Sequence, residues 1–299
     1  AIETADLVKM TTAQIVALAS SQMTSFTTDQ IASLNSAQIQ ALETSDLQQL
    51  NSAQIIALTT SQIPYLTTDQ VVALTTDQIK VIETADIQRL TTAQVASLTN
   101  TQVPALTSAQ ILALQSDQIA AMGAVNITKL TGDRMTLLSA SQVAALTTVQ
   151  IQGLTNAEIT KMSTAQVQEL TTAQMPAFTQ SQIALFSSAQ IAAMETQDVA
   201  SLTTAQIGWL TAQQMPHFTT AQIAALTTAQ VAAIEVGDLT KLTTAQIQHL
   251  GTGQISALTT AQMVSLTDVQ LAAIETADLA NLSTAQIASI TSVQVVNLT

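Results

Sequence analysis

Paired carboxylates recur along this chain at a fixed spacing, and they are the side chains best suited to chemistry. The motif Glu-x-x-Asp occurs six times in the 299 residues. Carboxylate oxygens are the ligands that Ca²⁺ prefers, so a regular column of such pairs is a candidate calcium site. The pairs are Glu3 and Asp6, Glu43 and Asp46, Glu83 and Asp86, Glu195 and Asp198, Glu235 and Asp238, and Glu275 and Asp278.

The same acids also have a purely structural interpretation. Acidic residues in a first helical turn interact favourably with the helix dipole. Basic residues follow several of the acids at i+3, where they share a helix face and can form ion pairs. This interpretation, a solvated and partly paired edge, is favoured over the metal site. The pairs expected are Asp6 with Lys9, Asp86 with Arg89, Glu158 with Lys161, and Asp238 with Lys241.

Other reactive side chains are few. The chain has two histidines and no cysteine, and no arrangement of a nucleophile with a base is recognisable. His217 and His249 lie in different repeats, so a shared metal site is not expected, and Tyr65 and Trp209 are expected to pack on the surface. The sequence therefore predicts no catalytic residues, no enzyme, and no cofactor other than a possible Ca²⁺.

An eight-residue repeat positions all of these residues. Its type sequence is Thr-Thr-Ala-Gln-Ile-Val-Ala-Leu at 11–18, and 37 such octads run without a gap from Glu3 to Leu298. Positions 5 and 8 are apolar in every octad, whereas position 6 accepts residues as different as Lys80 and Pro104. Positions 5 and 8 are therefore expected in the core, and position 6 is expected to face solvent.

Each octad carries the signature of a helix start. Thr11 and Gln14 form a capping box, in which each side chain pairs with the backbone amide of the other, and Met10 and Ile15 occupy the hydrophobic-staple positions around it. A single long helix is disfavoured because eight residues rotate the apolar pair by about 80° per octad, so no stripe forms. The expectation is an all-α solenoid with one short helix per octad.

A β-solenoid is the alternative. Thr and Ile favour strands, and Thr-x-Ala-x-Ile alternates as a strand would. Abundant Ala and Gln argue against it, as do only seven glycines for tight corners.

A second period of forty residues separates the Glu-x-x-Asp motifs within each half, and the four prolines at position 6 follow the same spacing. This favours five octads, or about 40 residues, per turn of the coil, with equivalent octads stacked. The carboxylates would then form a ladder with rungs about 10 Å apart, the spacing of packed helices. We expect one continuous array over residues 1–299, excised from a longer array or stacked end to end, with a register irregularity near 123–154 around Asp133 and Arg134.

Composition narrows the function. A net charge of −13 disfavours nucleic acid as a partner, and no apolar stretch is long enough for a membrane span. The repeated Leu-Thr-Thr-x-Gln-Ile-x-Ala-Leu resembles the Thr/Gln/Ala-rich octapeptide-repeat arrays of very long secreted or surface-exposed bacterial proteins. That resemblance implies an extracellular or bacterial cell-surface location. A structural stalk, fibre or surface-layer component that associates with its own repeats is expected; the alternative is a binding or adhesion module for a protein or glycan partner.

Overall fold

Short helices make up the chain in this computed structural model, which describes residues 2–130 and 132–296. Across those residues there are 32 α-helices and five 3-10 helices, and no strand. The all-α prediction is confirmed, and the β-solenoid alternative is wrong. No helix in the described ranges is long and apolar enough to cross a membrane.

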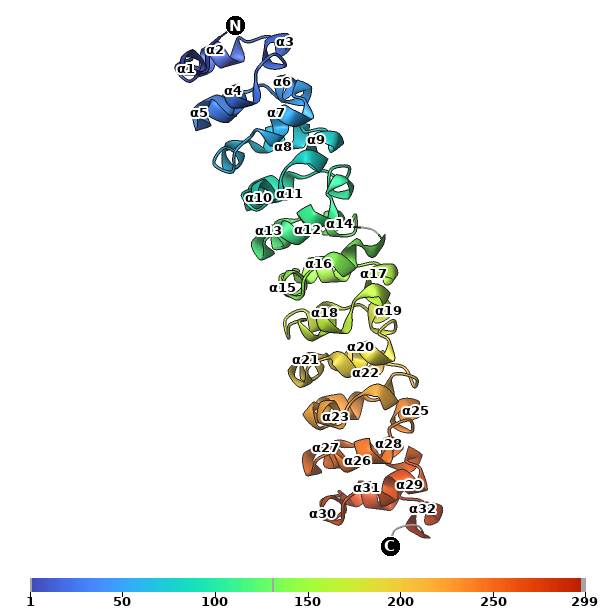
Figure 1. Ribbon diagram of the computed structural model, residues 1–299. Coiled ribbons are helices and arrows are strands. Elements are labelled where there is room, and N and C mark those ends of the chain that lie inside the picture. The colour runs from blue at the N-terminus through green and yellow to red at the C-terminus, as the bar shows by residue number, and fades with distance from the viewer. Residues whose placement is uncertain (1, 131, 297–299) are drawn as a thin grey trace. The chain divides into compact units, whose positions relative to one another are not determined.

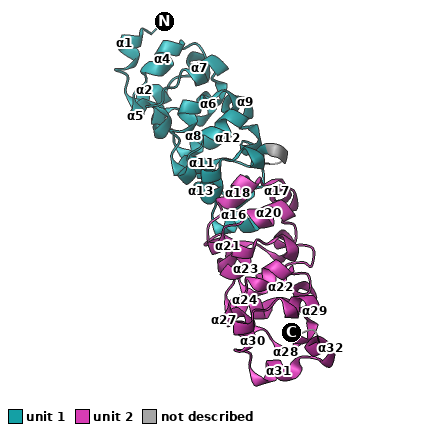
Figure 2. Cartoon of the chain, turned by 60° about the horizontal axis from the view of Figure 1, so that its bottom comes forward, with its two compact units in different colours: residues 1–153 teal, residues 154–299 magenta. Residues whose placement is uncertain are grey.

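Two compact units divide the chain, Ala1–Gly153 and Leu154–Thr299 (Figure 2). Each unit consists of short helices in successive layers (Figure 1). A single continuous array over residues 1–299 stays a prediction. The first unit contains α1 Thr4–Leu7, α2 Thr12–Val16, α3 Ser20–Met23, α4 Thr28–Ser33, α5 Ser36–Ala41, α6 Thr44–Gln49, α7 Ser52–Ile56, η1 Ile63–Tyr65, α8 Thr68–Ala73, α9 Thr76–Val81, α10 Thr84–Ile87, α11 Thr92–Ser97, η2 Val103–Ala105, α12 Ser108–Ala113, α13 Ser116–Ala121, α14 Ala124–Ile127, η3 Gly132–Leu137, α15 Ala140–Ala144 and α16 Thr148–Gly153. The second contains α17 Asn156–Lys161, α18 Thr164–Gln168, η4 Met175–Ala177, α19 Gln180–Ile183, α20 Ser188–Ala193, α21 Thr196–Ser201, α22 Thr204–Gly208, η5 Met215–His217, α23 Thr220–Ala225, α24 Thr228–Ala233, α25 Val236–Leu239, α26 Thr244–Gln248, α27 Thr252–Ala257, α28 Thr260–Ser265, α29 Asp268–Ala272, α30 Thr276–Leu279, α31 Thr284–Ser289 and α32 Ser292–Val296.

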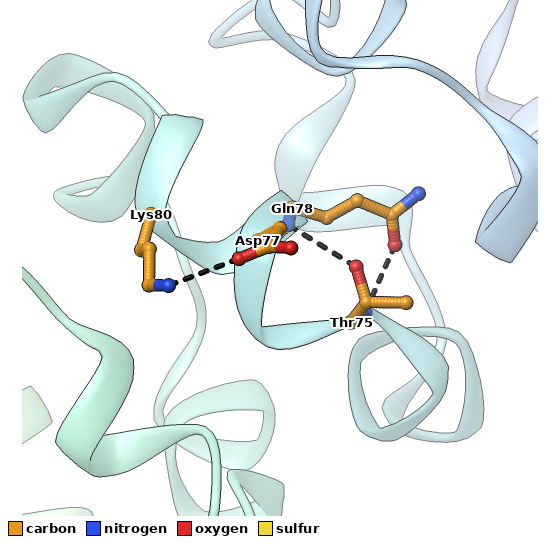
Figure 3. Close-up of polar contacts among 4 residues, drawn as sticks. All are labelled: Thr75, Asp77, Gln78 and Lys80. Atoms are coloured by element: carbon orange, nitrogen blue, oxygen red, sulfur yellow. Dashed lines mark hydrogen bonds and ion pairs between the residues drawn. The ribbon is translucent and has the colours of Figure 1, made fainter.

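The capping box starts the helices as predicted. At α9 the Gln78 amide donates to the Thr75 hydroxyl at 3.2 Å, and the Thr75 amide donates to Gln78 Oε1 at 2.9 Å (Figure 3). Two amides that the helix start leaves without backbone partners are thereby satisfied. The same reciprocal pair recurs in most octads of both units, so each helix begins from contacts within four residues.

Two extended residues end each octad and turn the chain. Leu74, at position 8, has φ −58° and ψ 133°, and Thr75, at position 1 of the next octad, has φ −70° and ψ 159°. Both conformations are open to residues with a side chain. The corner therefore needs no glycine, which explains how so many corners form with only seven in the chain.

Positions 5 and 8 form the core, as predicted. Val71 and Leu74 of one octad are 1% and 5% exposed, whereas Val72 at position 6 is 44% exposed. In the second unit Phe178 and Phe186, both at position 8, meet edge to face with ring centroids 5.3 Å apart. Because two apolar side chains per octad are buried, each helix turns the same face inward, toward helices of neighbouring turns.

The number of octads per turn differs from the prediction. Helices three octads apart pack together, as α8 does with α11 in the first unit and α24 with α27 in the second. Side-chain hydrogen bonds reach four octads back, because Gln70 Nε2 donates to backbone oxygens 28 and 31 residues earlier. One turn therefore contains between three and four octads, and the expected five octads per turn is wrong.

Candidate functional site

The glutamine at position 4 is a buried side chain that joins successive turns. Gln78 is 5% exposed, and its Nε2 donates to the carbonyls of Leu47 and Leu50 at 2.8 and 2.9 Å. Its Oε1 accepts from the amide of Thr75 at 2.9 Å. We call this side chain, with its bond to its own helix start and its two bonds to the turn before, the glutamine bridge.

The glutamine bridge uses all of the amide's polar atoms, since one oxygen accepts and both N–H groups have an acceptor. This satisfies a buried polar group that would otherwise destabilise the fold. In the second unit Gln206 repeats the arrangement, with Nε2 2.8 Å from the Met175 carbonyl and 2.9 Å from the Phe178 carbonyl. The capping box was predicted, but the bonds to the preceding turn were not.

One signal for the missing bonds was present in the sequence. A capping box accepts glutamate as readily as glutamine at N3, yet position 4 is Gln in 28 octads and Glu only at Glu158. A position that prefers the amide requires a donor as well as an acceptor. At Glu158 the Oε2 atom accepts from the Thr155 amide at 2.6 Å, while the buried Oε1 has no partner among the described residues.

Two other residues replace the glutamine in the divergent octads and still donate. Asn126 Nδ2 donates to the Leu98 carbonyl at 2.7 Å, 28 residues earlier. Arg134 donates from its guanidinium to the Pro104 carbonyl at 2.6 Å, 30 residues earlier. Arg134 therefore joins turns at the irregularity; the side chain of Asp133 lies outside the described residues.

The six Glu-x-x-Asp motifs place their aspartates at the same position. Asp6 is exposed, with 67% of its side chain accessible, and forms the expected ion pair with Lys9 at 3.5 Å. The other five aspartates are buried, so the expected solvated edge is wrong for them, because position 4 points into the stack. Their exposed fractions are 2% for Asp46, 3% for Asp86, 1% for Asp198, 8% for Asp238 and 7% for Asp278.

The motif glutamates are exposed N-cap residues with no side-chain capping bond: Glu3, Glu43, Glu83, Glu195, Glu235 and Glu275. The expected carboxylate ladder is also wrong. The helix of the second motif, α6, packs on α3 and α8, each three octads away, whereas the motifs recur every five octads.

Two of the expected ion pairs do not form in the described part of the chain: Asp86 with Arg89, and Asp238 with Lys241. The physical reason is that position 4 is buried, whereas Arg89 and Lys241 at position 7 are exposed. The second ion pair that does form joins Lys80 to Asp77 at 2.9 Å on the surface (Figure 3). Exposed pairs of this kind contribute at most about 1 kcal/mol.

The buried aspartates differ in their partners. Asp46 Oδ1 accepts from the Ser20 hydroxyl at 2.5 Å, and Asp278 Oδ1 accepts from the Thr252 hydroxyl at 2.6 Å. Oδ1 of Asp86 and both carboxyl oxygens of Asp198 have no hydrogen-bond partner among the described residues. These three oxygens thus lie buried without the donors that a charged carboxylate requires.

Burial shifts the acidity of these groups. It raises the pKa of Asp86 to about 6, and the charge of Glu83 adds to the shift. Burial likewise raises the pKa of Asp198 to about 6, with a smaller contribution from Glu195. The pKa of Asp238 is raised for the same two reasons, the nearby charge being that of Glu235.

Metal binding was the hypothesis for this column. Within residues 2–130 and 132–296, no three His, Asp or Glu side chains gather closely enough to hold a metal ion. Ca²⁺ binding by the motif residues stays a prediction.

The remaining residues singled out in the sequence lie apart from the buried column. Tyr65 is 46% exposed, and Trp209 is half-buried. His217 and His249 are both exposed, and His249, the C-cap residue of α26, has its Nδ1 2.8 Å from the carbonyl of Ala245. Neither histidine belongs to a group of His, Asp or Glu side chains that could hold a metal ion in the described residues.

Comparison with protein families accounts for the repeat. The model of the ALTTAQ repeat matches residues 1–36, 39–76, 79–116, 143–180, 191–228, 231–268 and 271–299. The chain belongs to the ALTTAQ repeat family. The longest stretch outside these ALTTAQ matches contains Asn126 and Arg134, where the glutamine bridge is replaced. Comparison with curated proteins finds no match.

Proposed function

We propose that this ALTTAQ array is a non-enzymatic structural protein: a stalk, fibre or surface-layer component, located outside the cell or on a bacterial surface. The observation that carries the proposal is the glutamine bridge. The buried polar side chains of the array are mostly engaged in holding one turn to the next. Polar groups used in this way stabilise the coil, and few buried polar side chains remain to form a catalytic site.

The glutamine bridge also has a direction. Each turn presents amide donors to the turn before it and carbonyl acceptors to the turn after it, as Gln102 does when it bonds the carbonyls of Val71 and Leu74 at 2.8 Å each. Gln14 and Gln22 bond their own helix starts at 2.8 Å through Oε1, and their side chains are exposed. Their Nε2 donors are available to carbonyls of further octads or of a second copy, and such a head-to-tail contact extends into a filament.

Sedimentation velocity and negative-stain electron microscopy over a range of concentrations test this proposal. The wild type should form species that lengthen with concentration, and the Gln14→Glu/Gln22→Glu variant should not, because each glutamate keeps the capping acceptor and loses the donor. Gln40→Glu, at an exposed position 6, is the matched control and should assemble as the wild type does. Wild type that stays monomeric at all concentrations would contradict end-to-end assembly.

A binding or adhesion role is the competing outcome, and exposed Tyr65 is the residue that favours it. Saturable binding to a glycan or protein that Tyr65→Ala abolishes would replace the structural proposal. A stalk or fibre should show no such loss.

A further inference from the structure

Asp86 and Asp198 occupy position 4, where a glutamine bridge joins two turns in most other octads. A glutamine at position 86 would face the carbonyls of Ile55 and Leu58, and one at position 198 would face those of Val167 and Leu170. None of these four carbonyls receives a side-chain hydrogen bond in the described part of the chain. Position 4 therefore faces two backbone acceptors at each site, whereas Oδ1 of Asp86 and both carboxyl oxygens of Asp198 have no hydrogen-bond partner among the described residues.

An aspartate side chain is long enough to form a hydrogen bond between turns. Asn126 has the same number of side-chain atoms as aspartate, and its Nδ2 lies 2.7 Å from the Leu98 carbonyl, 28 residues earlier. Leu58 and Leu170 occupy the equivalent place relative to Asp86 and Asp198. A protonated carboxyl has one O–H donor and an ionised carboxylate has none.

We propose that Asp86 and Asp198 form proton-dependent hydrogen bonds between turns. The hydroxyl of the neutral carboxyl donates a hydrogen bond to the carbonyl of Leu58 or Leu170, and the ionised carboxylate cannot donate one. The array is then held more tightly in mildly acidic surroundings than in neutral ones. This goes beyond the structural role proposed above and does not depend on it.

Asp86 and Asp198 differ from the partnered aspartates in the octad that lies three octads earlier. The hydroxyl donors to Asp46 and Asp278 come from Ser20 and Thr252, each the first residue of an α-helix three octads earlier. The corresponding residue for Asp86 is Thr60.

The octad of Thr60 contains Pro64 and forms the 3-10 helix η1 instead of an α-helix. Thr172 precedes Pro176 and η4 in the same way, and α21, which carries Asp198, packs against η4. An octad with a proline therefore lies three octads before each of these carboxyls.

Few charges act on Asp86. Helix α12, against which α10 packs, has no titratable residue. The octad three earlier contains exposed Tyr65, and the octad four later contains exposed Asp117. Within its own octad Asp86 has Glu83, which opposes ionisation, and exposed Arg89.

Asp198 has similar surroundings. Its helix α21 packs against α23 and η4, and neither carries a titratable residue. Glu195 in its own octad opposes ionisation, and exposed Glu169 lies in the octad four earlier. No cation among the described residues pairs with either carboxyl. Protonation is therefore the way in which each carboxyl loses its negative charge.

The direction of the pH effect follows from linkage. Unfolded aspartate titrates near 3.9, and burial raises the pKa of both carboxyls to about 6. Between those values the folded state holds more protons than the unfolded state, so stability falls as pH rises through this window and stays low above about pH 6.

Thermal unfolding of the full chain at a series of pH values tests the proposal, with Asp86→Asn/Asp198→Asn compared with wild type. Asparagine keeps the donor at every pH. The variant should match the wild type near pH 4 and exceed its Tm by roughly 3–10 °C at neutral pH. Asp77→Asn, on the surface, is the matched control, and its Tm difference from the wild type should not grow with pH.

Carbon-13 NMR of the aspartate carboxyls in the wild type gives a second readout that does not depend on a variant folding. Two carboxyl signals that titrate near pH 6 and disappear in the double variant support the proposal. A constant Tm difference across the pH range, or titration of both carboxyls below about pH 5, overturns it. A calcium-dependent rise of the wild-type Tm at neutral pH that the variant lacks also overturns it, because a metal and not a proton would then complete the site.

Discussion

A single residue type, glutamine at position 4, links the local and the long-range structure of this protein. Gln70 accepts from the Thr67 amide at 2.8 Å and donates to the carbonyls of Ile39 and Leu42 at 2.8 and 2.7 Å. Loss of either function leaves buried polar groups without partners, and this costs more than the net value of a hydrogen bond.

Gln70→Glu should therefore lower the free energy of unfolding by about 2–4 kcal/mol. Glutamate has the same shape and keeps the capping acceptor, but it turns an oxygen toward the two carbonyls of the preceding turn. Chemical denaturation at neutral pH measures the change. Gln40→Glu, exposed at position 6, is the control and should change stability little; equal losses in the two variants would contradict a bond between turns.

At the scale of the octad, the helix is short because both of its ends are specified. The capping box starts it, and the extended residues at positions 8 and 1 end it. Proline at position 6 is compatible with this unit because the octad can switch to a 3-10 helix. In η5 the His217 amide, at position 7, donates to the Gln214 carbonyl at 3.0 Å, and the missing amide of Pro216 is not needed for that bond.

Proline at position 6 should thus be tolerated in an octad that lacks it. Ala224→Pro in α23 is expected to cost less than about 1.5 kcal/mol, compared with about 3 kcal/mol for proline in an ordinary helix interior. Ala225→Pro, at position 7, should cost more because it removes the amide that the 3-10 helix uses. Thermal denaturation of the two variants checks the order, and a smaller loss for Ala225→Pro would refute it.

Within each unit, nearly equivalent octads offer the same carbonyls and the same glutamine to their neighbours. The first unit therefore does not depend on a unique pairing of one octad with another, unlike a globular domain. Stability in such arrays is a sum of repeat and interface contributions.

Deletion of residues 67–74, one whole octad, should preserve the helical circular dichroism per residue and lower Tm by only a few degrees. The junction of Leu66 with Thr75 keeps position 8 followed by position 1. Deletion of residues 67–70 removes half an octad, shifts positions 5 and 8 out of the core, and should unfold neighbouring turns. Collapse of helicity after the whole-octad deletion would show that the register is specified more narrowly.

The forty-residue period does not measure one turn of the coil, because packed helices lie three octads apart. Octads with Pro64, Pro176 and Pro216 lie three octads before those with Asp86, Asp198 and Asp238, which is the separation of packed helices. This pairing does not extend to every motif, because the octads three before Asp46 and Asp278 form the α-helices α3 and α27.

The sequence alone determined the helix starts and the inward positions, because a capping box and an apolar pair act within eight residues. Thr75 with Gln78, and Val71 with Leu74, were predictable for that reason. The tertiary structure decided the number of octads per turn, the second function of the glutamines, and the burial of Asp86 and Asp198. These depend on the angle at each corner and on groups 25 to 31 residues apart, a separation that the local pattern does not encode.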